Sequence, residues 1–311
     1  METTATTTDL SGVIPPLVTP LTIDGELDVP SLERLLTRLL DAGVDGVFSL
    51  SSSGESAFQD DALRDRTLST TASFIAGQVP VLAGAIDMQT HRVADRIRAA
   101  ANHNIAGVVV TAPFYAITGP DEVERHFRLL ADTASVPVWA YDIPVCVHTK
   151  LIPEMLVALG RDGVLAGVKD SSGDDISFRR LCQLNRAAEE PLRVLTGHEA
   201  VVDGAYLAGA HGVVPGLGNV DPHGYVRMHR AAVSGDFDTM RQEQDRLARL
   251  FEIVRAPKGM IGPAAGVGSF KTALRELGVF STNTMNEPMQ PITGPAVDEI
   301  RMILSETDLL P

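Results

Sequence analysis

Short apolar runs recur along the chain and alternate with longer stretches in which apolar residues stand three or four positions apart. The runs are nearly continuous in apolar or small residues, as expected for parallel strands that are covered on both faces. We predict eight strands, at residues 13–17, 44–50, 80–86, 107–112, 137–143, 164–169, 193–196 and 212–217. Between them the spacing predicts amphipathic helices, most clearly at 31–42, 90–103 and 121–133.

Eight strand–helix units predict the α/β class and, within it, a (β/α)8 TIM barrel. A doubly wound open sheet is the rival, but it usually has fewer strands and a phosphate-binding loop, which Pro15-Pro16-Leu17 is not. Helical spacing continues after the last strand, at 222–234, 236–254, 270–278 and 295–304. We therefore expect a flexible N-terminal tail (1–10), the barrel (11–235) and a helical C-terminal extension packed on the barrel (236–311).

Composition narrows the class of partner. The net charge of −14 predicts a surface that repels nucleic acid and anionic lipid, so we expect neither a nucleic-acid nor a membrane partner. The polar N-terminus lacks the basic start and the apolar stretch of a secretory signal. The two cysteines, Cys146 and Cys182, show no metal-ligand spacing. These features predict a cytoplasmic protein without a bound metal.

The chemistry of the chain points to one lysine. The chain has four lysines, at positions 150, 169, 258 and 271, and only Lys169 ends an apolar strand. If Val168 packs against the outer helices, the alternation of a strand turns Lys169 into the barrel. Desolvation there favours the neutral, nucleophilic amine that imine formation with a ketone requires. A structural ion pair between Lys169 and Asp170 explains this segment equally well.

Other reactive groups follow further strands, at the same end of the predicted barrel. The hydroxyls and N–H groups of residues 51–53 could form a carboxylate nest, although a turn that caps the next helix is the commoner use of such serines. Tyr141 could relay protons, or it could be a core tyrosine. Tyr115 lies in an aromatic loop after the fourth strand. The joint placement of these groups favours an active site.

Three motifs in this order resemble the dihydrodipicolinate synthase / N-acetylneuraminate lyase family. They are Ser52-Ser53-Gly54-Glu55-Ser56, Tyr141-Asp142-Ile143-Pro144 and Gly167-Val168-Lys169-Asp170-Ser171-Ser172-Gly173, and the resemblance covers nearly the whole chain. It implies a homotetramer, a dimer of dimers, that binds pyruvate or cleaves a larger 2-oxo acid to release it. The chemistry would run through a lysine imine, with no organic cofactor and no metal.

The resemblance also implies roles for individual residues. Lys169 would form the imine, and Tyr141 would shuttle the proton to and from the bond that is made or broken. Ser52 and Ser53 would hold the pyruvyl carboxylate. Tyr115 would reach across an interface into the neighbouring site and complete a hydroxyl relay with Ser53 and Tyr141.

Further positions would contact the substrate. The backbone carbonyl of Val214 matches one that faces pyruvate in the family, and Ser171 could contact a C4 hydroxyl. Gly197 and Glu199 follow the seventh strand, where the sialic acid lyases hold sugar hydroxyls. Gly216 lies in a glycine-rich loop that could leave room for a longer chain. A barrel rim without a substrate role is the alternative for these loops.

The chain departs from the synthases at one position. They carry an arginine two residues after the Tyr-x-x-Pro motif, and Cys146 stands there in this chain. A neutral thiol cannot make a bidentate contact with a carboxylate. We therefore expect an aldolase or lyase that acts on a 2-oxo acid, such as a 2-keto-3-deoxy sugar acid. The alternatives are the synthase itself, a dehydratase of the same family and a non-catalytic keto-acid-binding relative.

Overall fold

Eight parallel strands form the centre of the structure, a computed structural model that describes residues 10–310. In the sheet the strands follow the order β1-β8-β7-β6-β5-β4-β3-β2. Their bounds are Gly12–Val13 (β1), Val47–Ser49 (β2), Val81–Gly84 (β3), Gly107–Thr111 (β4), Val138–Asp142 (β5), Gly167–Asp170 (β6), Arg193–Thr196 (β7) and Gly212–Val213 (β8). The predicted tail is outside the described residues except for its last position.

The first and second strands close the ring. Phe48 donates its N–H to the carbonyl of Pro15 over 3.0 Å and accepts from the N–H of Leu17 over 2.8 Å. Because β1 also pairs with β8, this contact converts a curled sheet into a (β/α)8 TIM barrel. The predicted fold is therefore confirmed.

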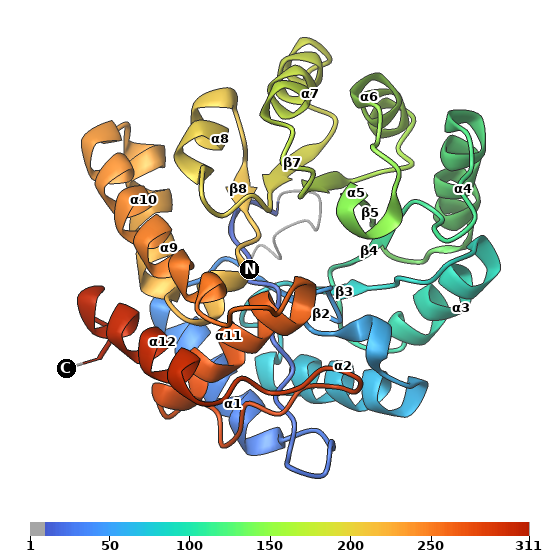
Figure 1. Ribbon diagram of the computed structural model, residues 1–311. Helices are drawn as coiled ribbons and strands as arrows, with labels where there is room; N and C mark the ends of the chain where they lie inside the picture. The colour runs from blue at the N-terminus through green and yellow to red at the C-terminus, as the bar shows by residue number, and fades with distance from the viewer. Residues whose placement is uncertain (1–9, 311) are drawn as a thin grey trace.

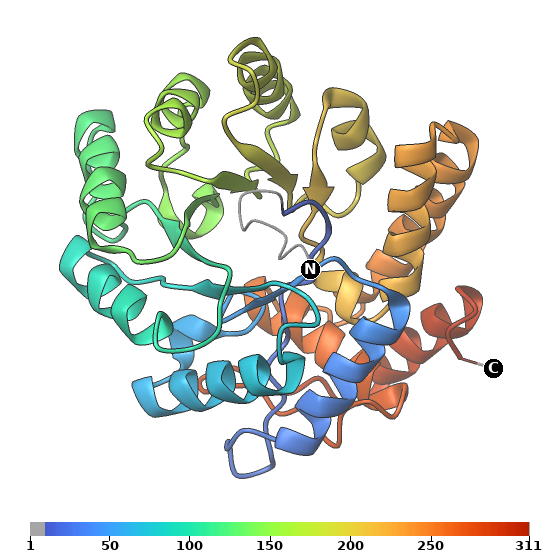
Figure 2. The ribbon, with the colours of Figure 1, turned by 180° about the vertical axis from the view of Figure 1, so that it is seen from behind.

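Helices surround the strands in a ring, which the two axial views show from opposite ends (Figures 1 and 2). Their bounds are Val29–Ala42 (α1), Asp61–Ile75 (α2), Thr90–Ala100 (α3), Pro120–Thr133 (α4), Pro144–Val147 (α5), Pro153–Arg161 (α6), Asp175–Ala187 (α7), Val202–Ala208 (α8), Pro222–Ser234 (α9), Phe237–Phe251 (α10), Gly262–Glu276 (α11) and Pro295–Glu306 (α12). No helix of the described residues is long and apolar enough to cross a membrane.

The sequence pattern explains how α1 packs. Leu32, Leu35, Leu36 and Leu39 lie on one face of this helix, and all four are fully buried. The Asp28 side chain accepts a hydrogen bond from the N–H of Ser31 and caps the helix start. The apolar stripe and the polar cap together fix α1 against the strands, as the helical spacing predicts.

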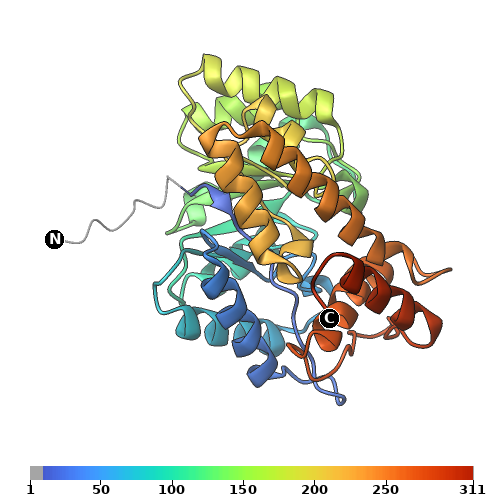
Figure 3. The same ribbon diagram turned by 90° about the vertical axis from the view of Figure 1, so that its left-hand side faces the viewer.

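The C-terminal helices differ most from the prediction. The stretch predicted as 236–254 is divided into α10 and a short 3-10 helix, Glu252–Arg255. Helix α11 begins at Gly262, eight residues before the predicted 270, because glycines hide the helical spacing in its first turns. In the side view, α11 and α12 lie together on one side of the molecule (Figure 3). Phe270 and Lys271 of α11 are buried against the barrel.

Candidate active site

Two neighbouring strands bring Tyr141 and Lys169 into contact. Tyr141 on β5 and Lys169 on β6 are register partners, so their side chains leave the sheet side by side. The amine of Lys169 donates a hydrogen bond of 3.0 Å to the Tyr141 hydroxyl. Both residues are buried, with 5% and 3% of their surfaces exposed. The structure thus places an amine and a phenol together at the end of the barrel where strands finish.

The surroundings of the Lys169 amine are aromatic rather than anionic. Its nitrogen lies 4.2 Å from the centre of the Tyr141 ring and 5.2 Å from that of Phe48. The ion pair with Asp170, which the sequence left open, is not formed, since Asp170 lies near Lys150 instead, with 3.6 Å between the charged atoms. Within residues 10–310, no carboxylate forms an ion pair with Lys169. Its amine is therefore not held in an ion pair within the described part of the chain.

The loop after β2 supplies a hydroxyl to this pair. The hydroxyls of Ser52 and Tyr141 lie 3.2 Å apart. The sequence-based expectation gave that contact to Ser53, and here the structure differs. Leu50 adopts a left-handed backbone with a φ of 57°. The turn that follows presents Ser52 to the phenol and Ser53 to Gly216, where an added Cβ would lie 3.4 Å from the Ser53 hydroxyl.

An ion pair that was not predicted anchors this loop. Glu55 and Lys271 form a salt bridge in which neither side chain has any exposed surface. Glu55 also accepts a hydrogen bond of 3.0 Å from the N–H of Asn286, and Lys271 donates over 2.8 Å to the carbonyl of Thr284. Burial lowers the pKa of Lys271, against the opposing effect of Glu55. The C-terminal helices thereby hold the serine loop in place.

Gly197 lies against the lysine side chain. A Cβ at this position would meet the Ser171 hydroxyl at 2.1 Å and the Cε atom of Lys169 at 3.1 Å. The N–H of Gly197 donates to the carbonyl of Asp170 over 2.7 Å, which fixes the approach. Ser171 and Gly197 therefore lie beside Lys169, and a side chain at position 197 would have to displace the Ser171 hydroxyl.

Glu199 brings an acid group to the same end of the barrel. Its carboxylate accepts a hydrogen bond from the N–H of Leu217 and lies 3.5 Å from the position of a Cβ on Gly216. Burial raises the pKa of Glu199 to about 7, although the Leu217 hydrogen bond and the charge of Lys169 act in the opposite direction. Val214 is buried directly after β8, where its N–H donates to the carbonyl of Thr196 over 2.7 Å.

Two predicted positions lie toward solvent. Tyr115 is 90% exposed, has a left-handed backbone with a φ of 73°, and makes no contact with the Lys169 cluster within this chain. Cys146 is an exposed free thiol. Its pKa is raised by partial desolvation and is lowered less strongly by the charge of Lys169, so the thiol lies within electrostatic range of the amine.

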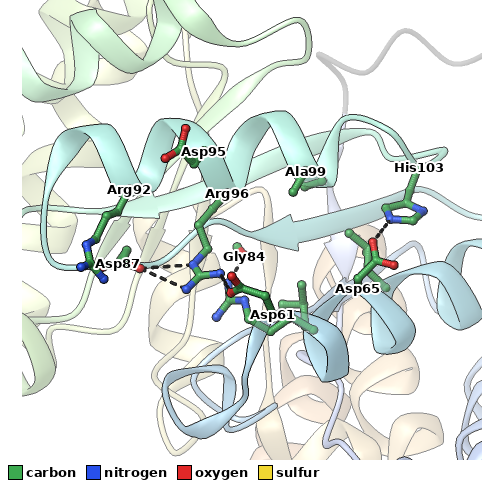
Figure 4. A pocket seen from close by; sticks show the side chains of 13 residues that line it. Asp61, Asp65, Gly84, Asp87, Arg92, Asp95, Arg96, Ala99 and His103 are labelled. Atoms are coloured by element: carbon green, nitrogen blue, oxygen red, sulfur yellow. Dashed lines mark hydrogen bonds and ion pairs between the residues drawn. The ribbon is translucent and has the colours of Figure 1, made fainter.

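A separate cavity of about 260 Å³ lies between α2 and α3, away from this cluster. Its walls carry several charged side chains, which Figure 4 shows close to one another. Arg96 pairs with Asp61 and, over 3.2 Å, with Asp87, and His103 lies 2.9 Å from Asp65. These charges largely compensate one another. The lining of the cavity also lacks the amine and hydroxyl groups that meet at the barrel end.

No group of three or more histidine, cysteine, aspartate or glutamate side chains within residues 10–310 could hold a metal ion. The groups that the structure brings together at the barrel end are an amine, a phenol, a serine hydroxyl and an acid of raised pKa. This set can form an imine with a carbonyl compound and can move protons around it.

The chain is similar to several known proteins. A family model described as the dihydrodipicolinate synthetase family matches residues 9–307. An uncharacterized DapA-like lyase of Halobacterium salinarum is 33% identical over 83% of this chain and 84% of its own length. A 4-hydroxy-tetrahydrodipicolinate synthase of Phenylobacterium zucineum is 29% identical over 96% of this chain and 98% of its own.

A solved structure is also similar. The YagE protein of E. coli K12, a prophage protein of the dihydrodipicolinic acid synthase family, was solved in complex with pyruvate. It is 25% identical to this chain with a TM-score of 0.90, and the match covers 96% of this chain and 99% of the other.

Proposed function

The chain belongs to the dihydrodipicolinate synthetase family, and from this premise we propose that Lys169 forms an imine with the keto group of pyruvate or of a larger 2-oxo acid. Members of the family are lyases of the class I aldolase type, which use no cofactor and form a Schiff base with a lysine. The observation that carries the proposal is the buried Lys169 amine, hydrogen-bonded over 3.0 Å to the Tyr141 phenol and free of any ion pair in the described chain.

The proposed reaction begins with attack of the neutral amine on the C2 carbonyl of the substrate. Tyr141 donates a proton as the resulting carbinolamine loses water, which leaves Tyr141 as a phenolate and gives a protonated imine that withdraws electrons from C3. Tyr141 accepts the proton of the C4 hydroxyl as the C3–C4 bond breaks, and an aldehyde leaves. The remaining enamine takes up a proton at C3, and hydrolysis of the imine releases pyruvate and restores Lys169.

The serine loop suits the carboxylate of such a substrate. Ser52 contacts Tyr141, and Ser53 faces Gly216, so both hydroxyls line the space next to the Lys169–Tyr141 pair. Hydroxyl and backbone N–H groups at a turn are good donors to an anion. We assign the pyruvyl carboxylate to Ser52 and Ser53, and we expect the backbone carbonyl of Val214 to face the pyruvyl group.

The other half of the substrate meets Glu199 and Cys146. Glu199 is half-buried, and with a pKa of about 7 it exists in both protonation states near neutral pH, so it can donate to or accept from a hydroxyl. Cys146 offers no cation to a second carboxylate. We therefore propose a polyhydroxylated 2-oxo acid, such as a 2-keto-3-deoxy sugar acid, with Ser171 and Glu199 as hydroxyl contacts and Gly197 and Gly216 as the space around them.

Borohydride trapping tests the imine. Reduction in the presence of pyruvate is expected to add the pyruvyl mass to the peptide that contains Lys169 and not to the peptide of the exposed Lys258. Absence of the adduct would show that the protein is a non-catalytic relative or acts on another class of compound.

A pyruvate-release screen tests the substrate. Sugar acids and aliphatic or aromatic 4-hydroxy-2-oxo acids are incubated with the protein, and pyruvate is measured with a coupled dehydrogenase. Release of pyruvate supports the lyase, whereas loss of water without release identifies a dehydratase.

The synthase reaction is the second candidate, because a relative of 29% identity is named a 4-hydroxy-tetrahydrodipicolinate synthase. It is tested directly by condensing pyruvate with aspartate semialdehyde. Rapid turnover in that assay would overturn the inference drawn from Cys146.

We also propose that the protein assembles as a homotetramer, a dimer of dimers. Tyr115 is 90% exposed on a backbone of left-handed φ, which gives a large aromatic side chain no role within its own chain. In an assembly it would enter the neighbouring site. Analytical ultracentrifugation is expected to show a tetramer, and Tyr115→Ala is expected to weaken it; a monomer at micromolar concentration would refute the assembly.

A further inference from the structure

Two buried carboxylates lie directly behind the Lys169–Tyr141 pair. Asp142 follows Tyr141 on β5, Asp170 follows Lys169 on β6, and the two aspartates are register partners in the same way as the tyrosine and the lysine. Side chains alternate between the faces of a strand, so the aspartates leave the sheet on the side opposite to the amine. Asp142 has 0% and Asp170 has 4% of its surface exposed.

A single cation lies between these carboxylates. The Lys150 ammonium group, on the segment after α5, forms an ion pair with Asp142 and lies 3.6 Å from Asp170 (Figure 1 shows α5 beside β5). The N–H of Leu151 donates to Asp142 over 3.2 Å. The N–H and hydroxyl of Ser172 donate to Asp170 over 2.8 and 2.7 Å.

The balance of charge makes Lys150 essential to the cluster. Two carboxylates at adjacent strand ends repel each other strongly when water is excluded, and among residues 10–310 the ammonium group of Lys150 alone forms ion pairs with them. Burial and the charge of Asp170 raise the pKa of Asp142 to about 6, while Lys150 lowers it. From α7, the thiol of Cys182 also feels the charge of Asp170, and burial raises its pKa to about 12, so it stays neutral.

We propose that Lys150 is a positioning residue of the active site, which binds Asp142 and Asp170 together and so fixes the contact between Tyr141 and Lys169. The proposal rests on the proposed function for its chemical meaning. Each aspartate shares a peptide bond with a residue of the reacting pair, so a shift of the strand ends moves the phenol and the amine. A displacement of about 1 Å at reacting groups can cost about 100-fold in rate.

The test compares Lys150→Met with Lys150→Arg and with the double variant Asp142→Asn/Lys150→Met. The exposed Lys258 provides a matched control, Lys258→Met, which removes a lysine of 75% side-chain exposure. The rate of borohydride trapping of pyruvate at Lys169 is measured at saturating pyruvate, together with the thermal midpoint of each variant.

Lys150→Met is expected to slow trapping by about 10- to 100-fold. Lys150→Arg restores most of the rate, because it keeps the charge between the carboxylates. The double variant recovers part of the trapping rate, since removing one carboxylate relieves the repulsion between Asp142 and Asp170. Lys258→Met traps at the rate of the wild type.

A pH profile separates positioning from mere stability. In Lys150→Met both carboxylates repel each other only while both are ionised, and the missing ammonium no longer lowers the pKa of Asp142. The deficit in trapping is therefore expected to be largest in alkaline solution and to shrink as the pH falls toward 6. A uniform deficit that follows the fraction of folded protein would assign Lys150 a structural role only and overturn the proposal.

A second readout does not depend on pyruvate. Reductive methylation with formaldehyde and cyanoborohydride, followed peptide by peptide, reports the reactivity of the Lys169 amine itself. If the wild type forms no pyruvyl adduct, the proposed function fails, and the methylation rates still decide the role of Lys150. Equal methylation of Lys169 in the wild type, Lys150→Met and the double variant would refute the positioning.

Discussion

Lys169 and Lys271 are both buried, with 5% and 0% of their surfaces exposed, yet their amines meet different partners. Lys271 forms an ion pair with Glu55 and donates to a backbone carbonyl. Lys169 donates to a phenol and lies over two aromatic rings. Burial alone therefore does not identify a reactive lysine.

The difference lies in the groups that each amine contacts. A carboxylate beside a buried ammonium compensates its charge and fixes it as a structural group. A phenol is uncharged and gives no such compensation, and imine formation requires an amine that is not held in an ion pair. We infer that Glu55 makes Lys271 a structural lysine and that Lys169, which forms no ion pair within residues 10–310, is the amine available to react.

The largest expected effect separates the two lysines outright. Lys169→Met is expected to abolish the pyruvyl adduct after borohydride reduction, because in the described part of the chain Lys169 is the lysine whose amine contacts Tyr141. The folded fraction of Lys271→Met should still form it. Peptide mass spectrometry gives the site of attachment, and an adduct that persists at another lysine in Lys169→Met would break the comparison.

The phenol partner is tested next. Tyr141→Phe is expected to slow turnover by about 10²- to 10⁴-fold, the usual contribution of a positioned proton-transfer group. Imine trapping should persist, since the amine is retained. Steady-state kinetics with the substrate from the release screen measure the effect, and turnover equal to that of the wild type would remove Tyr141 from the proton path.

Replacement of the structural lysine, Lys271, is expected to lower the stability of the protein. Lys271→Met leaves Glu55 buried without its counter-ion and is expected to cost about 3–5 kcal/mol in the free energy of unfolding. The double variant Glu55→Gln/Lys271→Met should lose less, because no unpaired charge remains. Urea unfolding measures both, with Lys169→Met as the matched control. Equal losses in Lys169→Met and Lys271→Met would contradict the comparison.

Replacement of Glu199 is expected to have the smallest effect on stability, and this effect depends on pH. Its pKa is about 7 in the folded protein, above the ordinary 4.5, so folding favours the protonated acid. The stabilisation is fully present below pH 4.5 and is lost as the pH rises through 7. Glu199→Gln should therefore gain up to about 3 kcal/mol relative to the wild type as the pH rises through that range.

Thermal unfolding at a series of pH values measures this difference. A constant difference between Glu199→Gln and the wild type would show that the acid near Lys169 is ionised throughout. In that case Glu199 would act as an anion rather than as a neutral donor.

Local patterns predicted the barrel and the place of Lys169. Apolar runs mark each strand because both faces of a parallel strand are covered, and a lysine at the end of one such run stands out. The alternation of strand residues also predicted that Lys169 points inward. The contact between Tyr141 and Lys169 also depends on the register of β5 and β6, which cannot be predicted from either segment alone.

Contacts between distant segments could not be predicted in the same way. Nothing in the local pattern around Lys150 indicates that it binds two buried aspartates. Nothing near Lys271 in the sequence indicates Glu55. Ser52 rather than Ser53 reaches Tyr141, because the direction of a serine in a turn depends on the backbone angles of its neighbours.

The anchor of the serine loop has a consequence for the order of synthesis. Glu55 accepts a hydrogen bond from Asn286, 231 positions further along the chain. At the usual pace of about 5–20 residues per second, a ribosome needs roughly 10–50 s to make the intervening segment. During that interval the carboxylate has neither Lys271 nor Asn286, so the loop that faces Tyr141 is not yet held. A nascent chain can therefore form most of its barrel before helix α11 is present to anchor the serine loop of the proposed pyruvate site.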